Sequence, residues 1–264
     1  MTGACRIEKV LQTIPGWEDA SWRALSGGRT NRALLLSADG RKAVLKTDRL
    51  PRTAPFNSRA EEARIQATAH VQGLAAPVLF VSETLILTEY LAGEIWQPCN
   101  LASDAKLAQL ASALRRLHRL PPSGRTFNAL RAAEAYMRKL AGRPVDRELA
   151  EHHLAKVRQQ GRPRNTSLCH NDLVAANIIS SDGVRLLDWE YAADNEPLFD
   201  LAVVIVENQL TSAQADYLFT QYTDGDSASL RARLQQQVTM YSSLAWLWAA
   251  AHSQSHTKYV SPQN

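Results

Sequence analysis

The sequence predicts an α+β protein with a small antiparallel sheet near its N-terminus and a mainly helical remainder. Short apolar runs bounded by turn residues fill positions 21–88, whereas apolar residues at helical spacing dominate from Asp104 onward. A predicted hairpin at 178–187 interrupts the helices. We expect an N-terminal lobe, 1–91, and a C-terminal lobe, 92–264, because 264 residues can bury two cores.

Composition narrows the class of ligand. The hydrophobic content of 45% and charged content of 21% are those of an ordinary globular protein. A formal charge of +4 suits an anionic ligand such as a nucleotide, and no block of Lys and Arg indicates nucleic acid. The longest apolar run, 244–251, is too short to span a bilayer, and no signal peptide is recognised. Three cysteines without metal-ligand spacing favour a reducing cytoplasm.

The N-terminal strands converge on a lysine. We expect strands at 21–25, 32–37, 42–47, 77–82 and 85–88, after a short helix at 7–13. A two-residue turn at Asp39-Gly40 would place Lys46 opposite Ala33. Gly27 and Gly28 lie in the loop before Ala33, and their free backbone N–H groups beside Lys46 would form an anion-binding concavity. The alternative for these glycines is a plain hairpin turn.

A helix at 57–71 follows, with Ala60, Ala63, Ile65 and Ala67 on its buried side. Glu61 or Glu62 is placed to reach Lys46, although the helix dipole alone also favours carboxylates there. The extended segment 89–94, which includes Glu89 and Leu91, would link the lobes and offer backbone groups to an adenine edge.

The C-terminal part is predicted to be helical, with helices at 104–120, 130–140, 146–160, 197–207, 212–222 and 227–252. Asp200 begins one of them, where it can cap the helix and receive hydrogen bonds from the loop around His170. His118 is interpreted as a structural, hydrogen-bonding histidine. The last ten residues are expected to fray.

The central motif is His170-Asn171-Asp172 followed by a hairpin. Asp182-Gly183 is a preferred two-residue turn, which would pair Ser181 with Val184, Ile178 with Leu187, and Asn177 with Asp188. The amide oxygen of Asn177 and the carboxylate of Asp188 would then meet beside Asp172. Oxygen ligands of this kind bind a hard cation, which in turn binds a phosphate. This spacing is typical of a kinase catalytic loop and its metal-binding aspartate. The alternative is a surface hairpin whose Asn and Asp cap turns.

These motifs together resemble the choline/ethanolamine kinase and aminoglycoside phosphotransferase superfamily, most closely its bacterial choline kinase-like and thiamine kinase-like members. The similar segments are the phosphate loop 25–31, the catalytic loop at His170, the metal motif 187–192 and the stretch 199–202. The resemblance covers nearly the whole chain. It implies a protein-kinase-like bilobal fold with ATP and Mg²⁺ in the cleft.

The resemblance also implies residue roles. Asp172, with His170, would be catalytic and would accept the proton of the substrate hydroxyl, while Asn177 and Asp188 would hold the metal. The implied nucleotide-binding residues are Gly27, Gly28, Thr30, Asn31, Lys46, Glu62, Glu89 and Leu91. Choline kinases often carry arginine at the position of Lys46. The lysine in this sequence therefore slightly favours the aminoglycoside branch.

The acceptor is expected to be an amine or quaternary ammonium alcohol, since aromatic faces and carboxylates recognise such cations. Candidate residues are Glu190, Tyr191, Glu207, Tyr241 and Trp248. Helical geometry places Tyr241 and Trp248 on one face with Ala245, and turns Trp246 away from it. The competing interpretation is that these rings pack in the core of the C-terminal helix.

The expected reaction is ATP-dependent phosphorylation of choline, with thiamine as the next candidate. An aminoglycoside phosphotransferase would need a wide acidic cleft, and the sequence after Gly225 is short of acids. A nucleotide-binding scaffold without activity is the non-enzyme alternative, but Lys46, Asp172, Asn177 and Asp188 are all present. A monomer or homodimer is expected.

Overall fold

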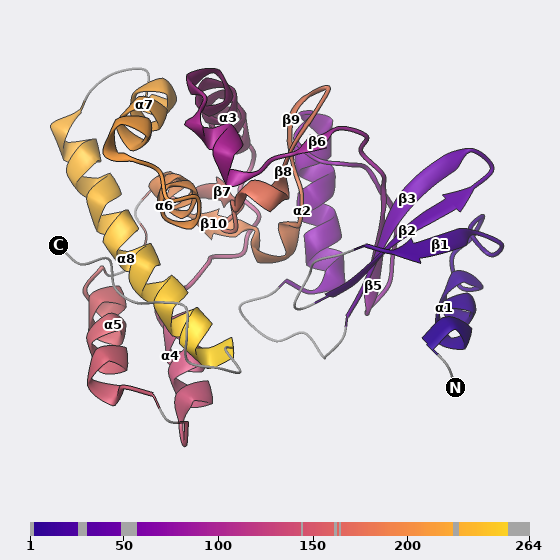
Figure 1. Cartoon of the computed structure of the whole chain (residues 1–264), viewed down its shortest axis with the longest axis horizontal. Helices are drawn as coiled ribbons and strands as arrows, with labels where there is room; N and C mark the ends of the chain where they lie inside the picture. The colour runs from indigo at the N-terminus through magenta and orange to yellow at the C-terminus, as the bar shows by residue number, and fades with distance from the viewer. Residues whose placement is uncertain are drawn as a thin grey trace.

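The computed structural model describes residues 3–25, 31–48, 57–143, 145–160, 163, 165–223 and 227–252. These residues form a five-stranded sheet and a mainly helical part that lie beside each other, with helix α2 (Arg59–Val71) between them (Figure 1). The predicted boundary between residues 91 and 92 falls just after the last strand of this sheet.

The sheet is antiparallel throughout, with the strand order β1-β2-β3-β5-β4. Its strands are β1 (Ser21–Ala24), β2 (Asn31–Ala38), β3 (Arg41–Asp48), β4 (Val78–Val81) and β5 (Leu85–Glu89). Each lies within two residues of its predicted span. The Asp39-Gly40 turn pairs Ala33 with Lys46, which confirms the predicted register.

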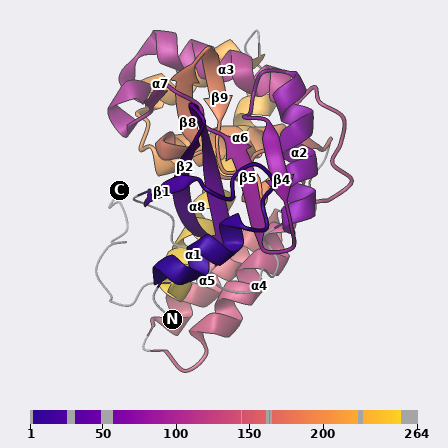
Figure 2. The ribbon, with the colours of Figure 1, turned by 90° about the vertical axis from the view of Figure 1, so that its right-hand side faces the viewer.

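The two faces of the sheet serve different purposes. Alternation along β3 places Leu45 on the face covered by α1 (Gly3–Leu11), where it packs with Ile7 and Leu11. Figure 2 views the sheet from the side of α1. Lys46 is the next residue along β3, so it lies on the opposite face, toward the helical part.

Helix α2 begins with a capping box. Ser58 accepts a hydrogen bond from the Glu61 backbone, and the Glu61 carboxylate accepts one from the Ser58 N–H at 3.0 Å. The prediction that Ala60 and Ala67 are buried is wrong, because both are exposed. The inward face instead carries polar side chains among its apolar ones. It consists of Arg59, Glu62, Ala63, Ile65, Gln66 and Ala69.

The helical part contains the predicted helices with shifts of three residues or fewer at their ends. They are α3 (Asp104–Leu117), α4 (Ala129–Leu140), α5 (Arg147–Gln159), α6 (Pro197–Glu207), α7 (Ser212–Thr223) and α8 (Ala228–His252). The sequence did not predict three short strands. They are β6 (Glu94–Ile95), β7 (Ser167–Cys169) and β10 (Ala193–Asn195), alongside the hairpin strands β8 (Ile178–Ser181) and β9 (Gly183–Leu186). None of the described helices is long and apolar enough to cross a membrane.

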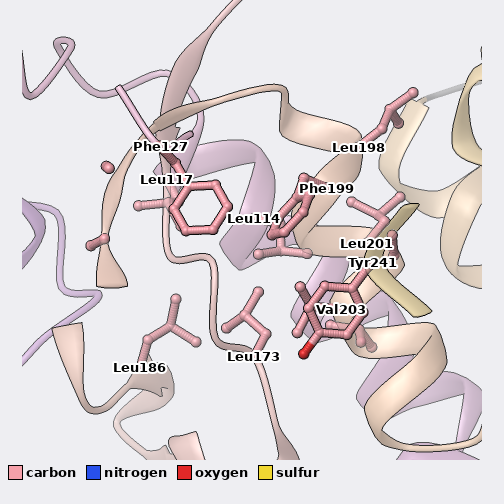
Figure 3. Close-up of a cluster of buried hydrophobic side chains, with 14 of the residues drawn as sticks. Leu114, Leu117, Phe127, Leu173, Leu186, Leu198, Phe199, Leu201, Val203 and Tyr241 are labelled. Atoms are coloured by element: carbon pink, nitrogen blue, oxygen red, sulfur yellow. The ribbon is translucent and has the colours of Figure 1, made fainter. Parts of the chain in front are cut away.

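One apolar core joins these helices to the β8–β9 hairpin. Figure 3 shows Phe127, Phe199 and Tyr241 in this core, with leucines from α3, α6 and the hairpin around them. The Phe127 and Phe199 rings lie 5.4 Å apart, and Tyr241 meets Phe199 edge to face, also at 5.4 Å. This aromatic row fixes α8 against α6 beside the loop that follows β7.

Candidate active site

A carboxylate from α6 holds the loop after β7. Asp200 accepts hydrogen bonds from the backbone N–H groups of His170 (2.9 Å) and Asn171 (2.7 Å), and lies 3.0 Å from Nε2 of His118. Asn171 has a φ of 65°, a left-handed conformation that asparagine tolerates. The prediction that Asp200 receives hydrogen bonds from this loop is confirmed.

Asp172 follows this anchored backbone and faces Asn177. The side-chain amide of Asn177 donates to the Asp172 backbone carbonyl at 2.9 Å and to its carboxylate at 3.1 Å. Burial raises the pKa of Asp172 to about 8, and the charges of Asp188, Glu190 and Glu207 add to that effect. At neutral pH a carboxyl group with such a pKa is mostly protonated, and its ionised fraction is a stronger base than an ordinary carboxylate.

The hairpin register differs from the prediction by one residue. Ser180, not Ser181, pairs with Val184, and Ile178 pairs with Leu186 instead of Leu187. The chain reverses more tightly than a two-residue turn because Gly183 adopts a left-handed φ of 81°. The Leu187 N–H therefore donates to the backbone carbonyl of Asn177 at 2.8 Å, so Asn177 does not lie opposite Asp188.

Asp188 lies two residues beyond Leu186, the last residue of β9, and itself has a left-handed φ of 64°. Its carboxylate lies 2.9 Å from Nζ of Lys46, in an ion pair that joins β3 to the hairpin. Burial alone would lower the pKa of Lys46, but the charges of Asp188 and Glu62 raise it above its ordinary value. For Asp188, burial acts to raise the pKa, but Lys46 holds it below its usual range. Both groups are therefore charged at neutral pH.

Two cavities meet at the hairpin. The Lys46 cavity, of about 460 Å³, lies against the sheet, and the Glu207 cavity, of about 350 Å³, lies among the C-terminal helices. Asn177 and Asp188 line both. A molecule in each cavity would therefore approach the other at these two side chains, next to Asp172.

The Lys46 cavity contains four of the predicted nucleotide-binding residues, which are Lys46, Glu62, Glu89 and Leu91. Of the two candidates Glu61 and Glu62, it is Glu62 whose charge raises the pKa of Lys46, and its carboxylate also pairs with Arg59 at 2.8 Å. Asn31 begins β2. The predicted residues Gly27, Gly28 and Thr30 lie outside the described residues.

All five predicted acceptor residues line the Glu207 cavity, namely Glu190, Tyr191, Glu207, Tyr241 and Trp248. The Tyr241 hydroxyl donates to the Glu207 carboxylate at 2.8 Å. Ala245 lines the same wall, whereas Trp246 stacks on His153 at 4.5 Å, as the helical face predicted. The walls thus combine carboxylates with aromatic faces.

Besides Phe199, which lies in the recognised stretch 199–202, this cavity has two aromatic residues that the sequence did not indicate. Phe127 precedes α4 and Tyr136 lies within it, and both line the Glu207 cavity. Neither belongs to a motif. They arrive there because α4 packs against α8, a contact that the sequence pattern does not specify.

His170 lies outside both cavities. Its side chain is fully buried, its Nε2 lies 2.9 Å from the Leu187 carbonyl, and its ring packs against Trp189 with centroids 4.9 Å apart. Burial lowers its pKa, which favours the neutral ring. The imidazole therefore ties the catalytic loop to the end of the hairpin.

Asn177 and Asp188 fit a hard divalent cation. The Asn177 amide nitrogen is turned toward Asp172, which leaves its oxygen for another partner. An amide oxygen and a carboxylate are donors that Mg²⁺ accepts, with phosphate oxygens and water completing its shell. The two side chains lie where the cavities join, which is where a metal bound to a nucleotide phosphate would be useful.

These features match those of kinase-like phosphotransferases: a sheet that presents a lysine, a loop with an aspartate, and a hairpin whose Asn and Asp line both cavities. The chain belongs to the phosphotransferase enzyme family, whose profile matches residues 21–236. It is similar to protein LicA of Haemophilus influenzae, with 31% identity over 207 residues that make up 74% of this chain and 61% of that protein.

Thiamine kinase of Escherichia coli is similar at 30% identity over 189 residues, 70% of this chain and 64% of that enzyme. The chain thus spans less than two thirds of the length of both proteins. Among solved structures, choline kinase LicA from Streptococcus pneumoniae superposes with a TM-score of 0.79 at 19% identity, covering 97% of this chain and 94% of that one. The predicted protein-kinase-like α+β fold is confirmed.

Proposed function

We propose that this protein transfers the γ-phosphoryl group of ATP, with Mg²⁺, to the hydroxyl of a small alcohol that carries an amine or quaternary ammonium group. One observation carries this proposal: a cavity lined by Lys46 and a cavity lined by carboxylates and aromatic rings meet at Asn177 and Asp188. Phosphoryl transfer requires mainly such positioning and charge neutralisation.

In this mechanism the acceptor hydroxyl attacks the γ-phosphorus, its proton passes to the Asp172 carboxylate, and the bond to the bridging oxygen of ADP breaks. Asn177 and Asp188 would hold Mg²⁺, which neutralises charge on the phosphate oxygens. Lys46 stays protonated beside them and binds phosphate. The hydrogen bond from Asn177 keeps the Asp172 carboxylate oriented toward the acceptor.

His170 is a positioning residue in this proposal. Because its ring is buried away from both cavities, it does not exchange protons with the substrate. Its bond to the Leu187 carbonyl fixes the backbone just before Asp188.

Choline is the first acceptor to test and thiamine the second. The aromatic rings of Tyr191, Tyr241 and Trp248 can receive a quaternary ammonium group, with Glu207 supplying the opposite charge. Similarity to a thiamine kinase supports the second candidate. The proposed reaction needs ATP, so a cytoplasmic location is part of this proposal. The expectation of a monomer or homodimer stays a prediction.

The test is an ATP-consumption assay with Mg²⁺ over choline, ethanolamine, thiamine and an aminoglycoside. We expect the highest kcat/KM with choline and no stimulation of ATP consumption by the aminoglycoside. ATP consumption that none of these alcohols stimulates would refute the proposal.

A further inference from the structure

A third cavity opens beside the Glu207 cavity. It has a volume of about 820 Å³ and shares four aromatic residues with its neighbour, which are Phe127, Tyr136, Tyr191 and Trp248. We name it the basic recess after the side chains Arg125, Arg131, Arg138 and Lys139 that line it. These four side chains therefore form an aromatic wall that both cavities contact.

The sign of charge reverses across this wall. Four carboxylates line the Glu207 cavity, those of Asp172, Asp188, Glu190 and Glu207, and no Lys or Arg is found among its described lining residues. The basic recess has the four cations and a single carboxylate, Glu61. Glu61 is already engaged with Ser58 and lies 3.8 Å from Arg125.

Two arginines of the basic recess have no counter-charge among the residues that the structure describes. Arg131 and Arg138 are exposed, and neither forms an ion pair with any residue in the described parts of the chain. They lie seven residues apart on α4 with Ala135 between them, so all three share one helix face. This spacing suits a planar or tetrahedral anion, because guanidinium groups bind carboxylate and phosphate with paired hydrogen bonds.

We propose that the basic recess binds an anionic group of the acceptor itself, carboxylate or phosphate, so that the physiological acceptor is a zwitterionic alcohol. The ammonium end would lie among the carboxylates and rings of the Glu207 cavity, and the anionic end would cross the aromatic wall to Arg131 and Arg138. This inference rests on the proposed function, because it names the acceptor of that same site. Choline would fill only the cationic half.

The test compares two acceptor pairs in which the second member adds a carboxylate-bearing group: choline with carnitine, which adds a carboxymethyl group, and ethanolamine with serine, which adds a carboxylate. The measured quantity is the ratio of kcat/KM with the carboxylate to kcat/KM without it. In the double variant Arg131→Gln with Arg138→Gln, we expect this ratio to fall about tenfold in at least one pair, as loss of a charge-assisted contact predicts. High salt should lower the same ratio in the unmodified protein.

The matched control is the double variant Arg147→Gln with Arg158→Gln, which removes two exposed arginines of α5 that line none of the three cavities. Its ratio should stay unchanged. Equal ratios in all three proteins, with choline or ethanolamine still phosphorylated, would overturn the inference and leave the proposed function intact. Failure to phosphorylate any acceptor would instead reject the proposed function and the inference with it.

A separate anion is the competing occupant. Choline kinetics are therefore measured with sodium sulfate and with sodium chloride at equal ionic strength. Sulfate could change the kcat or KM for choline in the unmodified protein but not in the Arg131/Arg138 variant. If the acceptor ratios are also unchanged, the basic recess would bind a separate anion and not the anionic group of the acceptor, which would overturn the inference. If sulfate does not change choline kinetics and the kcat/KM ratio falls in the Arg131/Arg138 variant, the result supports binding of the acceptor's own anionic group.

Discussion

At the scale of single residues, the site depends on three oxygen-bearing side chains with different surroundings. Asp172 is surrounded by carboxylates and has a raised pKa, whereas Asp188 is paired with Lys46 and stays charged. Asn177 carries no charge and orients Asp172. Under the proposed function, the environment separates two carboxylates of the same chemical type into a proton acceptor and a cation ligand.

Replacing Asp172 by Asn should lower kcat by about 100- to 10,000-fold, the usual contribution of a general base, because an amide does not accept the hydroxyl proton. Nucleotide affinity should stay within about twofold, since the residue lines only the acceptor side. Steady-state kinetics and nucleotide titration measure the two effects. Asp182→Asn at the exposed hairpin tip is the matched control, and undiminished turnover in Asp172→Asn would exclude the base assignment.

Replacing Glu207 by Gln should raise KM for a cationic acceptor about tenfold or more, because a desolvated counter-charge is lost. The KM for ATP should not change, as Glu207 does not line the Lys46 cavity. The amide can still accept the Tyr241 hydrogen bond, which preserves the local packing. Glu151→Gln on the exposed face of α5 controls for loss of one acid, and equal KM increases for both substrates would count against the pocket.

At the scale of elements, α8 connects the acceptor wall to the outer helices. One side of the helix presents Tyr241 and Trp248 to the Glu207 cavity, while Trp246 stacks on His153 of α5. The His153 ring also lies 3.2 Å from the Ser243 hydroxyl. Packing of α5 therefore supports the position of α8.

This contact should make stability depend on pH. Burial, helped by the nearby charges of His152 and Lys156, lowers the pKa of His153 to about 4 from an ordinary value of 6.5. The unfolded chain binds the proton more readily, so the contribution to stability is complete above pH 6.5 and is lost as the pH falls toward 4. Urea unfolding at several pH values measures it.

His153→Phe keeps a ring against Trp246 and should weaken the pH dependence between 6.5 and 4. His152→Asn, at the exposed neighbour, should retain most of that dependence. An unaltered slope in His153→Phe would show that other groups cause the acid sensitivity.

At the scale of the whole molecule, the segment entering α2 ties the N-terminal part to the metal-motif turn. Asn57 is fully buried; its backbone N–H donates to the Glu190 carbonyl at 2.8 Å, and its side chain donates to the Ala192 carbonyl at 2.8 Å. Arg125 donates to its side-chain oxygen. The two parts of the chain therefore share one buried hydrogen-bond network beside Asp188.

Asn57→Ala should lower the free energy of unfolding by about 1–3 kcal/mol, because buried partners lose their hydrogen bonds. Urea unfolding gives this value, and under conditions where the variant is folded we expect a larger loss in kcat than in nucleotide affinity. Gln109→Ala on the exposed face of α3 is the control. A stability change no larger than that of the control would contradict the structural role of Asn57.

Much of this architecture could be predicted from the sequence because local rules act strongly here. The Asp39-Gly40 turn allowed the β2–β3 register to be predicted. Helical periodicity predicted the ends of α3 to α8 to within a few residues. The hairpin register failed by one residue because a left-handed Gly183 allowed a tighter reversal. Ala60 and Ala67 were misplaced because α2 buries an Arg59–Glu62 ion pair, which a hydrophobic pattern does not reveal.

The sequence by itself determined which side chains can hold a phosphate, a cation and a proton, since Lys46, Asp172, Asn177 and Asp188 are chemically defined wherever they lie. Only the tertiary structure decided that a third cavity with the opposite charge adjoins the Glu207 cavity. The physical reason is distance along the chain. Contacts of α4 with α8 bring Tyr136 and Trp248 together across more than a hundred residues, and no local pattern encodes that meeting.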